Sequence, residues 1–239
     1  MRPSRPGQSG RPSAACWRRP PSTSSSSRSS GCRIASPWAT RASAASALAS
    51  TRPTGLPRPP RAGLGVQLEL LAVRKLLEGA RRLPRDAYVS INVSGATIQS
   101  VELRDLIMAV DRAITLEVTE HEPITNYQQV ASMVEGLTDV RLAVDDAGSG
   151  YATLQHVLRL RPQVVKLDRA WVSGVDGDRP RQVLISGLIS LAREIDATLI
   201  AEGVETPEEA RTLTDLGVVY AQGYLFGKPA PLGDILAQQ

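Results

Sequence analysis

Polar residues recur at the carboxyl ends of six short apolar runs that are rich in β-branched residues. These residues are Asn92, Glu117, Asp145 with Asp146, Lys166, Glu202 and Gln222. A buried strand seldom ends in a carboxylate without cause, because an unpaired buried charge is costly. The set offers oxygen ligands and contains no His or Cys, which favours hard divalent cations such as Mg²⁺ or Mn²⁺. The pattern predicts a metal centre, and paired ions there would activate a water and stabilise the leaving oxygen of a phosphodiester.

The elements that position these residues alternate along the chain. Strands are predicted at 88–93, 114–119, 140–145, 163–167, 198–201 and 218–221. An apolar stripe from Leu64 to Leu77 predicts a helix, and further helices are predicted at 96–110, 127–137, 151–160, 179–195 and 206–216. Such alternation indicates βαβ units and a parallel sheet. A closed α/β barrel has eight strands whose carboxyl ends converge on one rim. The fold class is therefore α/β, a TIM-like (βα)8 barrel that lacks its first two strands.

The first 61 residues differ in composition from the rest of the chain. They contain eleven arginines, ten of the seventeen prolines and fourteen serines, but no lysine, aspartate or glutamate. Since the whole chain carries +4, residues 62–239 carry a formal charge of −7. The segment has neither helical nor strand periodicity, which predicts disorder. Two domain regions follow: a disordered segment over 1–61 and a folded domain over 62–239.

Several function classes are disfavoured by the composition. Cys16 and Cys32 show no metal-binding spacing. No apolar run approaches the ~18–20 residues of a membrane span, and Arg18-Arg19 is followed by prolines and serines rather than an apolar signal region. The arginine-rich segment could contact phosphates of nucleic acid or acidic lipid. It has no fold to position such contacts, so no specific nucleic-acid partner and no membrane association are expected.

Six motifs stand in the order typical of one bacterial family. They are VSINVS (89–94), LEVTE (116–120), VDDAGSGYATL (144–154), VVKLD (164–168), AEGVET (201–206) and AQGYLFGKP (221–229). Together they resemble the EAL-domain cyclic di-GMP phosphodiesterases, and GLGVQLELLAVRKLL (63–77) is similar to the helix after that family's second strand. The resemblance implies hydrolysis of cyclic di-GMP to linear pGpG in the cytoplasm of a bacterium. It also implies that two copies of the chain form a homodimer through the barrel.

The resemblance also implies the roles of the site residues. A first metal ion would have the ligands Asn92, Glu117 and Asp145. A second ion would have the ligands Asp145, Asp146 and Glu202, with Asp145 bridging the two. The other implied site residues are Lys166, which holds the attacking water or a phosphate oxygen, Glu120, which braces the loop after Asp146, and Glu205 and Gln222, which orient ligands or waters.

The chain departs from the family pattern where the Glu-Ala-Leu motif and its following arginine are expected. The most similar segment, residues 43–48, has the sequence SAASAL and contains no acidic residue. One interpretation is that residues 1–61 are an out-of-frame reading of a GC-rich gene, and the alternatives are a genuine basic tail or a transit peptide. The absent glutamate leaves three hypotheses for function: an impaired phosphodiesterase, a catalytically silent receptor or interaction module, and a remnant without function. His121 and His156 are interpreted as surface or hydrogen-bonded histidines outside the site. Trp171 and Tyr224 are interpreted as packing residues at barrel loops, with a place for Tyr224 at the border of the ligand cleft as the alternative.

Overall fold

The computed structural model of the chain describes residues 64–84, 87–118, 124–148 and 150–237. The chain divides into two units after Ser30, and the description that follows concerns the second, Gly31–Gln239. The predicted disordered segment 1–61 lies outside the described residues. No helix within the described ranges is both long and apolar enough to span a bilayer.

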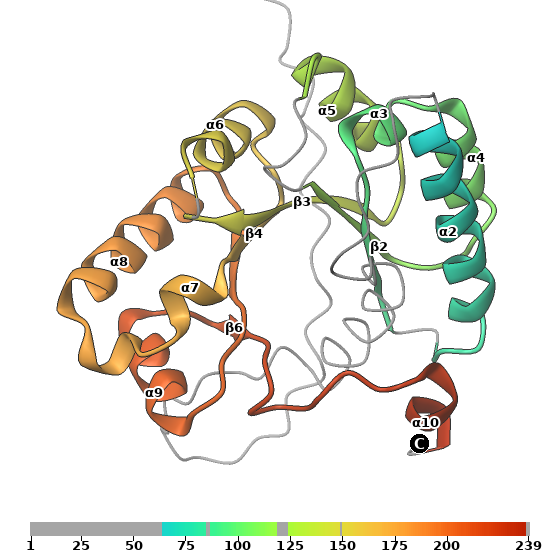
Figure 1. Cartoon of the computed structure of the whole chain (residues 1–239). Coiled ribbons are helices and arrows are strands. Elements are labelled where there is room, and N and C mark those ends of the chain that lie inside the picture. The colour runs from blue at the N-terminus through green and yellow to red at the C-terminus, as the bar shows by residue number, and fades with distance from the viewer. Residues whose placement is uncertain (1–63, 85–86, 119–123, 149, 238–239) are drawn as a thin grey trace, which may run out of the picture. The chain divides into compact units, whose positions relative to one another are not determined.

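A six-stranded parallel sheet forms the centre of the domain, with its strands in chain order. The strands are β1 (Val89–Asn92), β2 (Ile114–Val118), β3 (Val140–Ala147), β4 (Val164–Leu167), β5 (Thr198–Ala201) and β6 (Tyr220–Ala221). The sheet curls into a half-barrel with its helices on the outer side (Figure 1). In the described part of the chain, β1 and β6 each pair with one neighbour only. The six-strand prediction is confirmed.

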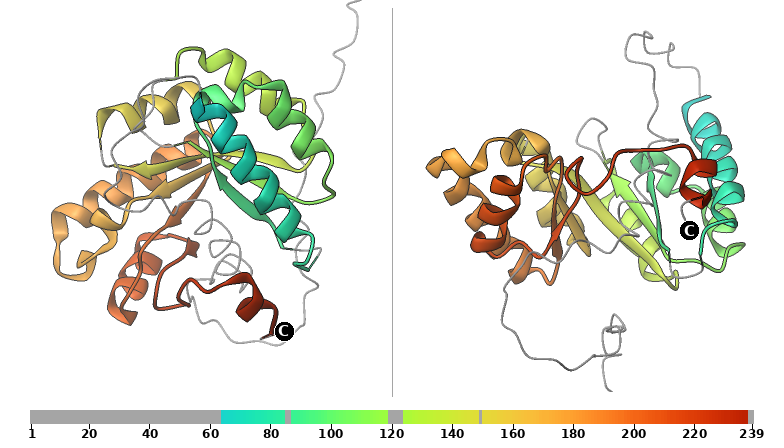
Figure 2. Two further views of the ribbon diagram at one scale, coloured as in Figure 1. Left: turned by 45° about the vertical axis from the view of Figure 1, so that its right-hand side comes forward. Right: turned by 90° about the horizontal axis from the view of Figure 1, so that it is seen from below.

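Helices cover the outer face of the sheet. The long ones are α2 (Leu64–Ala80), α4 (Val101–Met108), α5 (Tyr127–Glu135), α6 (Tyr151–Leu160), α8 (Arg179–Glu194) and α9 (Pro207–Leu216). Shorter elements are α3 (Gly95–Ile98), α7 (Arg169–Val172), the 3₁₀ turn η1 (Val175–Gly177) and α10 (Leu232–Ala237). The segment after β6 runs across to α2 in both views of Figure 2, and a Cβ on Gly79 of α2 would lie 3.3 Å from Cδ2 of Leu232.

The buried apolar side chains form two clusters. The first joins β1, β2 and β3 to helices α2 to α6, and the second joins β5 and β6 to helices α7, α8 and α9. The boundary between them crosses β4, because Val165 belongs to the first cluster and Leu167 to the second. Lys166 lies between these two residues and is itself buried.

The predicted helix at 96–110 was wrong in one respect, since two helices occupy that stretch. Ser94 begins α3 by accepting a hydrogen bond from the Thr97 N–H, and Ser100 begins α4 by accepting one from the Leu103 N–H. Two serine caps six residues apart stop one helix and start the next, because a serine side chain satisfies the free N–H groups of a helix start. The elements α7, η1 and α10 were not predicted, since each is too short to show a period.

Glu209 connects the start of α9 to two preceding loops. It is 5% exposed, and its carboxylate accepts hydrogen bonds from the backbone N–H groups of Gly174, Glu205 and Thr206 at 2.9, 2.8 and 3.0 Å. Thr206 completes the capping box by accepting from the Glu209 N–H. Burial favours the neutral carboxyl, but the three backbone N–H groups outweigh it and lower the pKa of Glu209 below 4.5. The carboxylate therefore stabilises the fold above that pH.

Replacing Glu209 by alanine is expected to lower the free energy of unfolding by about 2–3 kcal/mol, because three buried N–H groups lose their acceptor. Urea denaturation at pH 7 measures the loss. The difference from wild type should shrink as pH falls below about 4.5, where the wild-type carboxyl gains its proton in the unfolded chain first. Glu208→Ala is the control, since Glu208 is 54% exposed and its pair with Arg211 contributes at most about 0.5 kcal/mol. An equal loss in both variants would contradict the assignment.

Candidate metal centre

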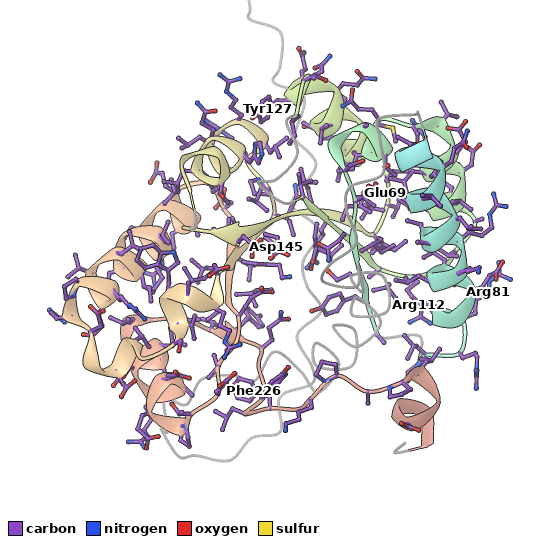
Figure 3. All side chains as sticks on the ribbon, in the orientation of Figure 1. Glu69, Arg81, Arg112, Tyr127, Asp145 and Phe226 are labelled. Carbon is purple, nitrogen blue, oxygen red and sulfur yellow. The ribbon has the colours of Figure 1, made fainter. Side chains whose placement is uncertain are left out.

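The ammonium group of Lys166 lies among three carboxylates at the carboxyl ends of the strands. Its Nζ is 3.0 Å from Oε1 of Glu117, 3.2 Å from Oδ1 of Asp145 and 2.5 Å from Oε1 of Glu202. These acids come from β2, β3 and the residue after β5, and Lys166 comes from β4 between them. Asp145 is labelled on the concave side of the sheet in Figure 3. Alternate strand residues share a face, so inward-pointing residues of neighbouring strands converge here.

Two uncharged side chains hold the acids in place. Ser90 on β1 donates its hydroxyl hydrogen to Oε1 of Glu117. Gln222, the residue after β6, donates from Nε2 to Oε1 of Glu202 at 2.5 Å. Because one donor lies on β1 and the other directly follows β6, both ends of the described sheet contribute to orienting the carboxylates.

The carboxyl groups raise one another's pKa. Burial and the nearby charges of Asp145 and Glu117 raise the pKa of Glu202 to about 8, although the charge of Lys166 acts to lower it. Burial, the charge of Asp145 and a hydrogen bond with Asp168 raise the pKa of Asp146 to about 6. The pKa of Lys166 is also raised, because the three carboxylates around it outweigh its own burial. One ammonium thus faces an excess of acidic groups.

The donor set fits divalent cations. One oxygen each of Asp145, Asp146 and Glu202 lie within 4.8 Å of one another. Among the described residues, Oε2 of Glu117 is buried without a hydrogen-bond partner, and a buried carboxylate oxygen without a partner is costly. Hard cations such as Mg²⁺ or Mn²⁺ prefer such oxygen ligands. They would supply the positive charge and the coordination that this cluster of acids lacks.

Residues 40–229 of the chain match the EAL domain. The chain belongs to the EAL domain family. The match begins inside the arginine-rich segment, and the boundary between residues 61 and 62 stays a prediction. The resemblance seen in the six motifs is confirmed, and the curled half-barrel is a partial version of the barrel of solved EAL domains.

Individual relatives of this EAL domain carry names that refer to cyclic di-GMP. The probable cyclic di-GMP phosphodiesterase PdeA of Escherichia coli is 28% identical over 183 residues, which is 72% of this chain and 25% of PdeA. The EAL domain of Mycobacterium smegmatis DcpA is 26% identical with a TM-score of 0.62, covering 74% of this chain and 83% of that one. A manganese and cyclic di-GMP complex of Klebsiella pneumoniae BlrP1 is 27% identical with a TM-score of 0.62, covering 69% and 45%.

The chain spans about a quarter to a third of the length of the first curated relatives that it matches. This EAL domain is thus related to cyclic di-GMP phosphodiesterases that are longer than this chain.

The structure of the EAL domain places most of the predicted site residues together. Asn92 lies opposite Glu117 in the register of β1 and β2, and Asp145, Asp146, Lys166, Glu202 and Gln222 gather as described. Glu205 pairs with Arg169 instead: its Oε1 is 2.8 Å from the guanidinium, and its side chain is 40% exposed. Glu120 and His121 lie outside the described residues. His156 is buried and hydrogen-bonded to the Tyr127 hydroxyl at 2.9 Å, in agreement with a structural role.

Two site residues of the EAL domain were missed at the level of sequence. Ser90 lies two residues before Asn92 on β1, so strand alternation puts both on one face, and this period could have identified it. Asp168 follows β4 directly and hydrogen-bonds with Asp146. It also caps α7, because its Oδ1 accepts a hydrogen bond from the Ala170 N–H at 2.5 Å.

Gly223 allows the loops after β5 and β6 to meet. It has φ +156°, and a Cβ there would lie 2.2 Å from the carbonyl oxygen and 2.3 Å from the nitrogen of Val204. The Val204 N–H in turn donates to the carbonyl oxygen of Gln222 at 3.1 Å. Glu202 and Gln222, whose side chains are hydrogen-bonded to each other, flank this contact. The close approach of the two backbones therefore helps to position Glu202 in the candidate metal centre.

Gly223→Ala is expected to lower the free energy of unfolding by about 2–3 kcal/mol, because a methyl group there overlaps backbone rather than a flexible side chain. Chemical denaturation measures it. Gly187→Ala in α8 is the control, since nothing lies within 4 Å of its Cβ position and alanine favours a helix by up to about 1 kcal/mol. Wild-type stability of the Gly223 variant would show that the two loops can separate at little cost.

Proposed function

We propose that this EAL domain binds cyclic di-GMP at the carboxyl-end rim of its sheet and hydrolyses one phosphodiester bond slowly, with two divalent cations. The observation that carries the proposal is the convergence of Glu117, Asp145 and Glu202 on Lys166, with Asp146 beside them. The names of its relatives supply the substrate class, since PdeA is called a probable cyclic di-GMP phosphodiesterase.

Mg²⁺ or Mn²⁺ held by these acids would activate a water and neutralise charge on the phosphate. One ion would take Asn92, Glu117 and Asp145 as ligands. The other would take Asp145, Asp146 and Glu202. Two ions balance the acids better than Lys166 alone, because four carboxyl groups face one ammonium in this cluster.

Lys166 contributes a hydrogen-bond donor to the reaction. Its ammonium has three N–H bonds, and all three carboxylates near it compete for them. Divalent cations would neutralise these carboxylates, and an N–H of Lys166 would then be available to a phosphate oxygen or to the attacking water. Ser90 and Gln222 keep Glu117 and Glu202 oriented throughout. Glu205, through Arg169, would fix the loop after β5, and Glu120 is assigned its bracing role by resemblance alone.

Slow turnover follows from the sequence that precedes α2. The family match begins at residue 40, and residues 1–61 contain no aspartate or glutamate. The glutamate of the Glu-Ala-Leu motif is therefore absent, and the first ion would have one protein ligand fewer. An ion pair must keep a spacing of about 3.5–4 Å for two-metal catalysis, and misplacement by about 1 Å can reduce the rate on the order of 10²-fold.

The test uses the full chain of 239 residues with excess Mn²⁺ and cyclic di-GMP, and follows pGpG by chromatography. We expect turnover on the order of 10²-fold below that of an EAL domain with its motif intact. A rate equal to that of the intact domain would contradict the importance given to the missing glutamate. Absence of both turnover and cyclic di-GMP binding would contradict the proposal itself.

A second candidate function is a receptor that binds cyclic di-GMP without hydrolysis. It is favoured by the ion pairs of Lys166, whose ammonium links Glu117, Asp145 and Glu202 to one another. Calorimetric binding of cyclic di-GMP with no pGpG after prolonged incubation would select this function.

Sedimentation velocity of the same preparation tests the homodimer that the resemblance implies.

A further inference from the structure

Glu69 of α2 makes three hydrogen bonds to the turn that follows β1. Its Oε2 accepts from the backbone N–H of Ser94 at 2.9 Å, from the Ser94 hydroxyl at 2.9 Å and from the Thr97 hydroxyl at 2.6 Å. Glu69 is half-buried and is labelled beside this turn in Figure 3. One carboxylate oxygen thus ties a helix to a turn that lies 25 residues further along the chain.

The tethered turn is directly connected to the candidate metal centre. Asn92, the last residue of β1, lies two residues before Ser94. Between them, the Val93 N–H donates to the carbonyl oxygen of Glu117 at 3.0 Å. The backbone of residues 92–94 is therefore fixed by β2 through Val93 and by α2 through Glu69.

Capping alone does not explain the contact. Ser94 already caps α3, because its Oγ accepts from the Thr97 N–H at 3.1 Å. Glu69 adds bonds from a separate helix, on a strand that has only one strand neighbour in the described part of the chain. The ends of such strands open locally most easily. Asn92 brings no charge to a cation, so its contribution as a ligand depends on its position.

We infer that Glu69 is a positioning residue for the metal centre, which holds the end of β1 so that the Asn92 side chain stays beside Glu117. The inference rests on the proposed function, since it assigns Asn92 to a divalent cation. Glu69 touches neither cation nor substrate. It acts through Ser94 and the backbone of β1.

The test measures Mn²⁺ binding to the full chain, by electron paramagnetic resonance of the free ion, without substrate. Glu69→Ala removes the acceptor and is expected to weaken Mn²⁺ binding about tenfold, the scale found for residues outside the ligand shell that orient metal ligands. Glu69→Gln keeps an acceptor oxygen in the same place, and its affinity should stay within about threefold of wild type, because a neutral acceptor is roughly half as strong. Glu78→Ala, at an exposed acid on the same helix, should leave the affinity unchanged.

A second readout is local to the turn. Hydrogen exchange of the amides at residues 93–98 should accelerate in Glu69→Ala, while exchange in α8 stays as in wild type. Wild-type Mn²⁺ affinity in Glu69→Ala, unchanged exchange at 93–98, or an equal loss of affinity in Glu69→Gln would each overturn the inference. The last result would identify the charge of Glu69, rather than its position, as the cause. If the wild-type chain itself binds no Mn²⁺, the proposed metal centre is wrong and the inference falls with it.

Discussion

Replacing Asp145 by asparagine is expected to weaken Mn²⁺ binding to the full chain at least about 100-fold. Residues that merely orient a metal ligand are worth about 10–100-fold, and Asp145 is assigned to both ions. In the Asp145→Asn variant, any hydrolysis of cyclic di-GMP should also fall below detection. The fold should survive, because asparagine has the same shape and relieves repulsion with Asp146 and Glu202. Titration with Mn²⁺ and urea denaturation of the metal-free protein measure the two effects separately.

The matched control for this variant is Asp176→Asn. Asp176 is an exposed acid in η1, and the same chemical change there should leave Mn²⁺ affinity and stability as in wild type. If Asp145→Asn binds Mn²⁺ as tightly as Asp176→Asn does, Asp145 is not a ligand.

Replacing Lys166 by methionine is expected to lower the free energy of unfolding of the metal-free protein by about 3–5 kcal/mol. Removing one partner of a buried ion pair leaves an uncompensated buried charge, and here three carboxylates lose the same cation. Methionine has nearly the length of lysine but carries no charge. Urea denaturation with EDTA gives the loss, and repetition with Mn²⁺ should recover much of it, since divalent ions can supply the missing positive charge.

Lys75→Met is the control, because Lys75 is exposed on α2 and exposed charges contribute at most about 1 kcal/mol. Recovery by Mn²⁺ should be specific to the Lys166 variant. Two variants that lose the same stability, or a Lys166 variant that Mn²⁺ does not stabilise, would show that the ammonium does not occupy the place of a cation.

Strand positions could be predicted from the sequence because buried parallel strands need continuous apolar runs. The run at 198–201 gave the bounds of β5 without error, and the run at 218–221 was trimmed to Tyr220–Ala221 at the sheet edge. The ends of α6 at Leu160 and of α9 at Leu216 were predicted correctly, whereas α5 ends at Glu135, two residues before its predicted end, and the division at Ser100 was not predicted. There the apolar period continues through residues 95–108, and only the serine side chain decides where one helix ends.

The candidate site could be predicted as a set of residues but not as a set of contacts. Polar residues at strand ends indicate a common rim, and parallel pairing delivers Glu117, Asp145 and Glu202 to it. The partner of Glu205 could not be predicted, because Arg169 reaches it from α7, an element too short to show a period. The bonds of Glu69 were missed for a similar reason, since they join α2 to a turn far along the chain.

The boundary between the two apolar clusters has a consequence for the cooperativity of unfolding. Strands β2 and β3 belong to the first cluster and β5 to the second, yet Glu117 and Asp145 from one side and Glu202 from the other share the ammonium of Lys166. Separate clusters often open as separate units. Here neither half can open without stripping a carboxylate from that ammonium. The ion cluster thus links the halves of the sheet, and a bound cation that strengthens the link would make the domain unfold in one sharper transition.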